Sequence, residues 1–351
     1  MKYLFELNFN TATHFGSDIA GYGVEEVQGF AHADTIFSAL MNTIIATRNT
    51  YNYKWLNDFL SEEKIEQILP FKVSSFGFVK YIEGQYKYFI PKPEFIPNEL
   101  IPKKDYNNWK IFKNIKYITL ERYLDILKKN SFDLDKIIEK EIDNFWLEYT
   151  RDQIQTDIVT AATNIYTTGE VFYEKFTKPF ILVDLDEENL PLNDFINFLR
   201  LVGKFGLGGR RTSGCGIFSF TDEDWFSIEP NTKEEVKIIN PGFNYEKNRG
   251  RIKLKEILSF NSSKKYLFST LFPKESINDI YAYNLIIRRG WIFSTSSFRQ
   301  LKRKTCYMIG EGSIFKKEIK GTLVDTTPDA FTDHIVWRYG IPFYLPYTDL
   351  E

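Results

Sequence analysis

Residues 204–216 read KFGLGGRRTSGCG, a stretch with five glycines, three cations and no acidic residue. Glycine admits a positive φ angle and leaves backbone N–H groups open to a partner. The guanidinium groups of Arg210 and Arg211 match the oxygens of phosphate. The composition fits contact with a polyanion, and it fits equally a glycine-rich turn whose arginines are solvated.

Two familiar phosphate-binding motifs do not fit this stretch. In a P-loop that starts at Gly203 the second glycine falls at Gly208, but Gly209 stands where lysine is required. A dinucleotide fingerprint that starts at Gly206 continues at Gly208 and then has Arg211 in place of its last glycine. Binding of ATP or NAD therefore loses its usual sequence support, and we expect no cofactor. A polymer of phosphates remains, because it needs no pocket built around one pyrophosphate.

The composition is that of a soluble globular protein. The chain has 351 residues, enough for two domains, with 43% hydrophobic and 26% charged residues. No apolar run approaches the ~20 residues that cross a bilayer. The beginning, MKYLFELNF, has strand alternation and not the layout of a signal peptide, so we expect a cytoplasmic protein. Cys215 and Cys306 give neither a disulfide framework nor metal-ligand spacing, and we expect no metal site.

A second basic segment, called the basic track below, lies at residues 288–304 and reads RRGWIFSTSSFRQLKRK. Because the formal net charge of the chain is −2, contact with nucleic acid requires such a local region. Aromatic residues alternate with its cations, which suits backbone contact together with base stacking. An exposed strand edge protected by cations is the other interpretation. Its cations and aromatic residues are Arg288, Arg289, Arg299, Lys302, Arg303, Lys304, Trp291, Phe293 and Phe298.

The apolar pattern of the first half predicts an ordered series of strands and helices. Residues 3–9 alternate like a strand, and Asp34 is a suitable N-cap for a helix to about Arg48. Glu83 and Gly84 predict a hairpin between strands at 78–82 and 85–90. A strand at 179–185, a helix at 193–204 and a strand at 217–220 follow. With the insertion near 95–178 set aside, this is the ferredoxin-like order, which RRM domains share.

The insertion carries two helical patterns and an extended hairpin. The hairpin is expected from residues 154–163 and 170–176. The residues of the helical patterns are Leu120, Tyr123, Leu124 and Leu127 in the first, and Leu134, Ile137, Ile138, Ile142, Phe145 and Trp146 in the second.

The second half of the chain is mostly strand-like. Candidate strands lie at 251–260, 285–293, 305–309, 319–324 and 334–339. We expect a ferredoxin-like module at residues 1–225, which contains the insertion, and a second one at residues 236–351. The fold class is thus α+β, with two ferredoxin-like, RRM-like modules.

Five motifs, in this order and spacing, resemble one known family. They are HFG at 14–16, ADTIFSAL at 33–40, GLGGRRTSG at 206–214, GEGSIF at 310–315, and His334 followed by IPF at 341–343. Together they look like the fourth subunits of the Csm complex of type III-A CRISPR systems. These subunits are RAMP proteins of the group that caps the 5′ end of the guide RNA. The glycine loop is shared by RAMP proteins generally, whereas its combination with HFG and GEGSIF is much more specific.

The resemblance implies two ferredoxin-like RAMP modules, a thumb-like hairpin and no catalytic activity. It implies binding to the repeat-derived 5′ tag of CRISPR RNA and contacts with two proteins, the large polymerase-like subunit and a backbone RAMP subunit. The assembled ribonucleoprotein serves antiviral defence. In such a thumb the turn near 158–163 would wedge between bases by shape and apolar contact, because it has no arginine there.

The residues that we expect to contact RNA fall into three groups. His14 and Gly16 belong to the HFG motif, with a structural hydrogen bond as the other role for His14. The glycine loop contributes backbone amides, hydroxyls and two arginines that would hold phosphates. The basic track is the third group, with a protein interface as its rival role. The loop and track residues are Gly206, Gly208, Gly209, Arg210, Arg211, Thr212, Ser213, Arg288, Arg289, Lys302, Arg303 and Lys304.

Two alternatives to a non-catalytic subunit remain open. The first is a metal-independent RAMP endoribonuclease of repeat RNA, with His14 as general base and His32 and Lys204 as further participants. The second is an unrelated RRM-like RNA-binding protein that acts alone. We do not expect Asp34 to bind a metal ion, because it lacks companion carboxylates.

Overall fold

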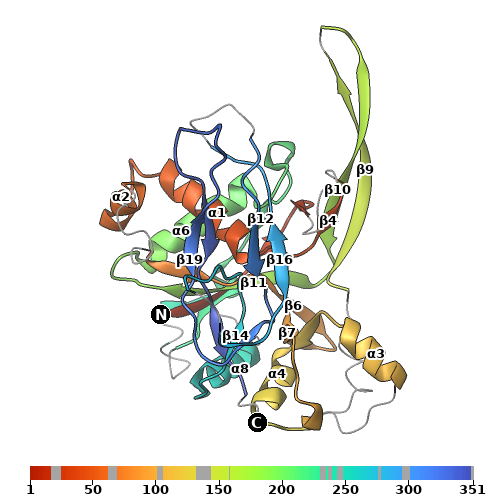
Figure 1. The fold of residues 1–351 in the computed structure, drawn as a ribbon, viewed down its shortest axis with the longest axis vertical. Helices are drawn as coiled ribbons and strands as arrows, with labels where there is room; N and C mark the ends of the chain where they lie inside the picture. The colour runs from red at the N-terminus through yellow and green to blue at the C-terminus, as the bar shows by residue number, and fades with distance from the viewer. Residues whose placement is uncertain are drawn as a thin grey trace.

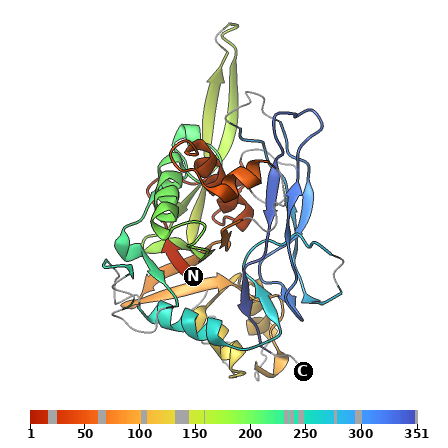
Figure 2. The same ribbon diagram turned by 90° about the vertical axis from the view of Figure 1, so that its left-hand side faces the viewer.

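The computed structural model consists of a main body, a long projecting hairpin and a group of C-terminal strands packed against the body (Figures 1 and 2). It describes residues 1–16, 25–61, 69–100, 106–131, 144–157, 159–229, 235, 239–242, 248–275, 278–294 and 301–348. Among these residues no helix is long and apolar enough to cross a membrane.

An antiparallel sheet forms the centre of the body. Its strand order is β13–β1–β11–β6–β7–β8, and β5 also pairs with β11. Phe5 of β1 lies opposite Ile181 of β11, and Phe180 of β11 lies opposite Gly77 of β6. The strands are β1 (Lys2–Glu6), β5 (Phe71–Val73), β6 (Gly77–Ile82), β7 (Gln85–Pro91), β8 (Tyr117–Thr119), β11 (Thr177–Leu185) and β13 (Trp225–Ser227).

Both faces of this sheet are buried, because alternate side chains of a strand enter two different cores. Ile181 and Val183 of β11 pack in one core with helices α1 (Ala33–Ala46), α2 (Lys54–Leu60) and α6 (Leu192–Phe205). Phe180 and Leu182 pack in the other with α4 (Leu120–Leu127), α8 (Asn248–Ser259), β14 (Lys265–Leu267) and β21 (Tyr344–Pro346). Burial of both faces explains the continuous apolar run FILV in β11.

The elements expected in the first half are confirmed, with one correction at the start of α1. The residue before the helix is His32, and its side chain makes no capping bond. Asp34 lies within the first turn, is 2% exposed and contacts the second half of the chain. The short elements nearby are β2 (Asn8–Phe9), β3 (Phe15–Gly16), β4 (Val27–Gln28), β12 (Phe218–Ser219), and the 3₁₀ turns η2 (Asn98–Leu100), η3 (Arg211–Ser213) and η4 (Asp222–Asp224).

An extended hairpin is present, but not with the expected bounds, because its turn falls inside the first expected strand and residues 164–169, between the two expected strands, belong to β10. Strands β9 (Trp146–Thr156) and β10 (Thr163–Tyr173) pair along their whole length and project away from the body (Figure 1). The turn lies at 157–162, where Asp157 accepts hydrogen bonds from the N–H groups of Val159 and Thr160. The predicted wedge at 158–163 therefore lies at the tip, although residue 158 is outside the described residues.

The helical part of the insertion is confirmed only for its first pattern. That pattern forms α4, and a further helix, α3 (Tyr106–Asn114), precedes it. Most of the second pattern falls in residues 132–143, which lie outside the described part. Its last member, Trp146, begins β9 and is not helical.

In the second half, four of the five expected strands are confirmed and one is wrong. Residues 251–260 form most of α8, in which Leu254 and Ile257 are buried and Ile252 is exposed. The apolar–lysine alternation of IKLK imitates a strand, whereas the buried residues follow helical spacing. The strands are β15 (Ile280–Ala282), β16 (Leu285–Arg288), β17 (Cys306–Ile309), β18 (Ile314–Phe315), β19 (Thr322–Asp325) and β20 (Trp337–Gly340).

The outer half of the β9–β10 hairpin should be dispensable for folding. We expect replacement of residues 153–166 by Asn-Gly, which suits a two-residue turn between Asp152 and Thr167, to change the free energy of unfolding by less than about 0.5 kcal/mol. The described residues of this segment are exposed or half-buried, and Thr168 and Val171 below it are retained. Urea denaturation checks this, and a loss of several kcal/mol would show that the tip supports the body.

Candidate nucleic-acid interface

The glycine-rich stretch forms a compact loop between the end of α6 and β12. Backbone φ angles are positive at Gly206, Gly208, Gly214 and Gly216, and also at Arg210, where φ is 55°. The chain thus reverses direction several times within eleven residues. Such a path favours glycine at the positive-φ positions.

Four of the five glycines allow close packing, Gly206 and Gly216 within the loop and Gly208 and Gly209 against His14 and Phe15. A Cβ atom at Gly216 would lie 2.1 Å from the carbonyl oxygen of Leu207, and one at Gly206 would lie 2.5 Å from that of Cys215. Only Gly214 of the five has open space beside it. Close packing within the loop and against the HFG motif therefore explains most of the glycine content without a ligand.

The amides of the loop are only partly open to a ligand. The N–H groups of Leu207, Gly209 and Gly216 donate to the carbonyl oxygens of Gly216, His14 and Ala12, at 2.9, 2.8 and 2.7 Å. At the start of η3, the N–H groups of Arg211 and Thr212 have no hydrogen-bond partner among the described residues. The side chains of Thr212 and Ser213 are exposed. The part of the loop that faces outward is therefore η3.

His14 lies beneath the loop and is buried. Its Nδ1 is 2.9 Å from the carbonyl oxygen of Gly169 in β10, and its own carbonyl oxygen accepts the N–H of Gly209. Burial lowers the pKa of the imidazole, and the hydrogen bond to Gly169 acts in the opposite direction. His14 thus links the loop to the base of the hairpin. The neighbouring Gly16 is exposed, with open space beside it.

Arg211 joins the glycine loop to the basic track. Its guanidinium lies over the ring of Phe293, 4.1 Å from the ring centroid. Burial lowers the pKa of Arg211, but the group remains a cation at neutral pH. Arg210 is half-buried, and its Nη1 is buried without a hydrogen-bond partner in the described residues. The two segments that the sequence marks as basic therefore form one surface.

Several cations of the track lie on this surface and others do not. Arg289 is exposed, and Lys302 is exposed with its Nζ 5.3 Å from the ring centroid of Trp291. The Nζ of Lys304 is 2.7 Å from Asp329 Oδ1. Arg299 and Phe298 lie outside the described residues.

The structure corrects the placement of Arg288. Only 8% of this side chain is exposed, and it binds Asp34 of α1 with its Nε and Nη2, at 3.1 and 2.9 Å from the carboxylate oxygens. Arg338 of β20 binds the same carboxylate through Nη1. Burial alone would raise the pKa of Asp34, but the two arginines outweigh it and hold that pKa well below its ordinary value. Arg288 is thus part of a buried ion cluster that joins the two halves of the chain.

A second buried network explains part of the GEGSIF motif. His32 Nδ1 is 2.9 Å from Glu311 Oε1, and the hydroxyl of Ser75 donates to the same oxygen. Ser75 Oγ in turn accepts the N–H of Ala33, the first residue of α1. Glu311 has no role that the sequence predicts, because the residues around it do not indicate partners more than 230 residues away.

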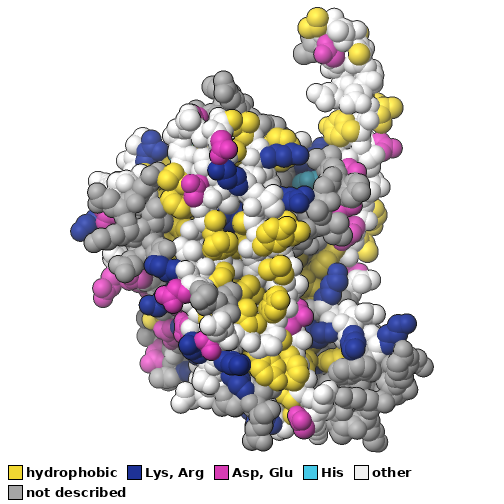
Figure 3. All heavy atoms as spheres, in the orientation of Figure 1, with side chains coloured by type: hydrophobic (Ala, Val, Ile, Leu, Met, Phe, Trp, Pro, Cys, Tyr) yellow, Lys and Arg dark blue, Asp and Glu magenta, His cyan; other side chains and the backbone are white. Residues whose placement is uncertain are grey.

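Alternate side chains from Tyr281 to Phe293 form an apolar stripe on the surface. The odd-numbered residues point outward while Ile286, Arg288 and Ile292 are buried, as the period of a strand requires. Hydrophobic side chains gather along the middle of this face (Figure 3). The outward residues, with Tyr307 from β17 beside them, are Tyr281, Tyr283, Leu285, Ile287, Arg289, Trp291 and Phe293. An exposed apolar patch of this kind marks an interaction surface.

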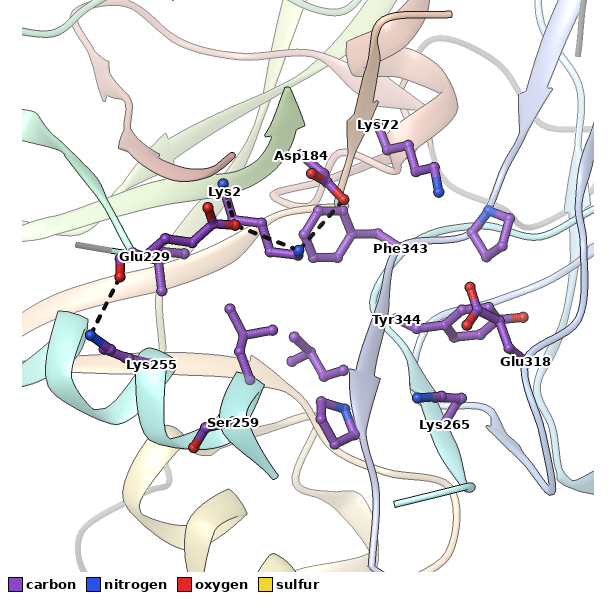
Figure 4. A pocket seen from close by; sticks show the side chains of 15 residues that line it. Lys2, Lys72, Asp184, Glu229, Lys255, Ser259, Lys265, Glu318, Phe343 and Tyr344 are labelled. Carbon is purple, nitrogen blue, oxygen red and sulfur yellow. Dashed lines mark hydrogen bonds and ion pairs between the residues drawn. The ribbon is translucent and has the colours of Figure 1, made fainter. Parts of the chain in front are cut away.

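A separate depression of about 480 Å³ lies between the edge of the central sheet, α8 and β21 (Figure 4). Four lysines line it, but Lys2 is 3.7 and 3.8 Å from the carboxylates of Asp184 and Glu229, and Lys255 donates to the carbonyl oxygen of Glu229. Three carboxylates, those of Asp184, Glu229 and Glu318, also line the depression, whereas residues 204–216 and 288–304 contain no acidic residue.

The fold is that of proteins from type III CRISPR interference complexes. A solved Csm3–Csm4 subcomplex of type III-A contains a chain that matches this one with a TM-score of 0.59 and 20% identity, over 99% of this chain and 100% of that one. A chain of a Csm1–Csm4 cassette in complex with cA4 matches with a TM-score of 0.57 and 14% identity, over the full length of both.

Within this class the chain resembles Csm4, which confirms the resemblance drawn from the motifs. Residues 260–347 match the family of the CRISPR Csm4 C-terminal domain. Csm4 of Streptococcus thermophilus is 24% identical over 348 residues, which is 97% of each chain. Csm4 of Methanocaldococcus jannaschii is also 24% identical, over 96% of this chain and 95% of its own.

Loss of the carboxylate charge at Asp34 should strongly destabilise the protein. We expect Asp34→Asn to lower the free energy of unfolding by about 3–5 kcal/mol, because it leaves the buried arginines uncompensated. Because the pKa of Asp34 is depressed in the folded state, the variant has its full deficit in free energy of unfolding, relative to the parent protein, above about pH 5. The deficit shrinks only below the ordinary aspartate pKa of about 3.9.

Urea denaturation at several pH values measures both effects. Asp329→Asn is the matched control, because its carboxylate is exposed and pairs with Lys304 on the surface. We expect that variant to lose less than about 1 kcal/mol. Equal losses in the two variants would contradict the role assigned to Asp34.

Proposed function

We propose that the protein is the non-catalytic, RNA-binding subunit of a type III-A CRISPR (Csm) complex, which anchors the repeat-derived 5′ tag of CRISPR RNA in the cytoplasm. The observation that carries the proposal is the contact of Arg211 with Phe293, which merges the glycine loop and the basic track into one surface. Cations, hydroxyls and exposed aromatic rings on one surface suit a single-stranded nucleic acid. His14 would act from beneath, by fixing the loop to the hairpin.

We propose further that the body is a ferredoxin-like RAMP module. The order β1, α1, β6, β11, α6, β13 along the chain, with β1 and β11 central and β6 and β13 beside them, supports this. A second such module would occupy residues 236–351, in which the described residues form α8 and several short strands. The projecting hairpin would be the thumb, with apolar Val159, Ile154 and Ile165 exposed toward its end.

In this proposal the chain also docks two proteins, the large polymerase-like subunit and a backbone RAMP subunit. Among the solved relatives, Csm4 is found in complexes with Csm1 or Csm3. The apolar stripe offers a surface for one such contact. Its part away from the glycine loop, formed by Tyr281, Tyr283, Leu285 and Ile287 with Tyr307 beside them, contains three tyrosines and no charged residue, which is the composition of a protein interface core.

The endoribonuclease alternative finds little support in the geometry. A general base must reach the proton that it removes, and His14 is buried with one ring nitrogen at the carbonyl of Gly169. His32 is also buried and contacts Glu311. No hydrogen bond joins His14, His32 and Lys204 within the described residues.

Removal of the loop arginines should weaken RNA binding. We expect Arg210→Ala with Arg211→Ala to lower the affinity of the assembled complex for tag-bearing RNA at least tenfold. The slope of log affinity against log salt should fall by about 1.4, since each phosphate contact to a single strand contributes about 0.7. Filter binding at several salt concentrations measures both quantities.

Lys110→Ala with Lys128→Ala is the matched control for this experiment. It removes the same charge from an exposed position in α3 and from the exposed C-cap of α4, and these helices cover the other face of the sheet. We expect its affinity to stay within about twofold of the parent. Equal RNA retention by both double variants would rule out the loop as the anchor.

The isolated chain should not cut repeat RNA. Incubation of labelled repeat RNA with the pure protein in EDTA should leave the RNA intact, because the candidate groups are not assembled for general acid–base chemistry. Cleavage that His14→Ala abolishes would instead establish the endoribonuclease.

A further inference from the structure

Three arginines surround one carboxylate where α1 meets the second half of the chain. Arg288 and Arg338 bind Asp34, as described above. Arg303 lies in the same electrostatic environment, with Asp34, Arg288, Arg338 and the thiol of Cys306 as its charged and titratable neighbours. Its backbone N–H donates to the carbonyl oxygen of Gly290, which places it beside the segment that carries Arg288.

The side chain of Arg303 has no partner among the described residues. It makes no hydrogen bond or ion pair there, and its Nε atom is buried and unsatisfied. Burial, and after it the charge of Arg338, lowers the pKa of Arg303 to about 10, so the guanidinium stays charged at neutral pH. The charge of Arg303 thus adds to a poorly solvated place in which Arg288 and Arg338 already bind Asp34. Unpaired charge of this kind destabilises a folded protein unless another anion completes the site.

The surroundings of Arg303 indicate which anion this is. Arg303 is half-buried and stands between the exposed residues Lys302 and Lys304 of the basic track. Lys302 lies over Trp291, and Arg289 is exposed close by in the same track. A row of cations with aromatic rings fits successive phosphates of a nucleic acid better than it fits one carboxylate of a protein. A guanidinium also matches the paired oxygens of a phosphodiester.

We propose that Arg303 binds a backbone phosphate of RNA and that the cation excess around Asp34 is a site prepared for that phosphate. The inference rests on the proposed function, since it requires that the chain binds RNA. It assigns Arg303, a half-buried cation of the basic track, to a specific phosphate contact.

The proposal predicts that one substitution weakens RNA binding without lowering the stability of the folded chain. Arg303→Met keeps the apolar length of the side chain but removes its charge. In the assembled complex we expect it to lower the affinity for tag-bearing RNA about fivefold to tenfold and to reduce the salt slope by about 0.7, the value for one single-strand phosphate. In the full chain alone we expect the denaturation midpoint to be unchanged or higher, because like-charge repulsion is relieved.

Two further variants make the test specific. Lys317→Met removes a charge from a position outside the basic track that is likewise paired on the surface, with Asp279, and we expect parental affinity and salt slope. Arg303→Lys keeps the charge but not the planar fork, and we expect the parental salt slope with only part of the affinity restored.

The outcomes separate this inference from the proposed function. If the parent complex fails to bind tag RNA, the proposed function fails. If the parent binds and Arg303→Met binds equally well with the same slope, only the inference is overturned. A fall in the denaturation midpoint for Arg303→Met would overturn it too, by assigning the residue a structural role. So would loss of subunit assembly with RNA affinity retained, which would identify a partner's carboxylate as the missing anion.

Discussion

The buried charge of Asp34 fixes how the two halves of the chain meet. A carboxylate in the protein interior must be compensated, and Arg288 and Arg338 do this from two strands of the second half. Because guanidinium and carboxylate groups have strict geometry, the contact sets where β16 and β20 lie relative to the start of α1. The pair of His32 and Glu311 adds a second connection beside it.

This arrangement decides which residues form the candidate interface. With β16 held against α1, the segment that follows it reaches the glycine loop, and Phe293 comes under Arg211. The loop and the basic track then present their exposed cations on one side of the molecule. The same alternation along residues 281–293 turns Arg288 inward and Arg289 outward. Arg288 and Arg289, which the sequence pattern does not distinguish, thus have different roles.

Much of the body could be predicted because its strands and helices carry strong local patterns. The helix at 193–204, the hairpin at 78–90 and the strand at 179–185 agree with the structure, since apolar periodicity and turn residues act over short distances. The strand prediction for residues 251–260 was wrong because four residues, IKLK, are too few to distinguish the period of a strand from that of a helix. Packing of Leu254 and Ile257 against the sheet favours the helix. The N-cap assignment of Asp34 failed because its partners are more than 250 residues away.

The sequence by itself determined the strand and helix order of the body, the glycine loop and the resemblance to the Csm subunit, because these depend on local spacing and on motif order. The tertiary structure alone decided the burial of Arg288, the position of His14 beneath the loop and the unpaired state of Arg303. Each of these follows from which distant groups share a site, and charge compensation between distant segments leaves no signal in the local pattern. The residues that were easiest to count in the sequence, the cations, were therefore the ones whose roles only the fold could assign.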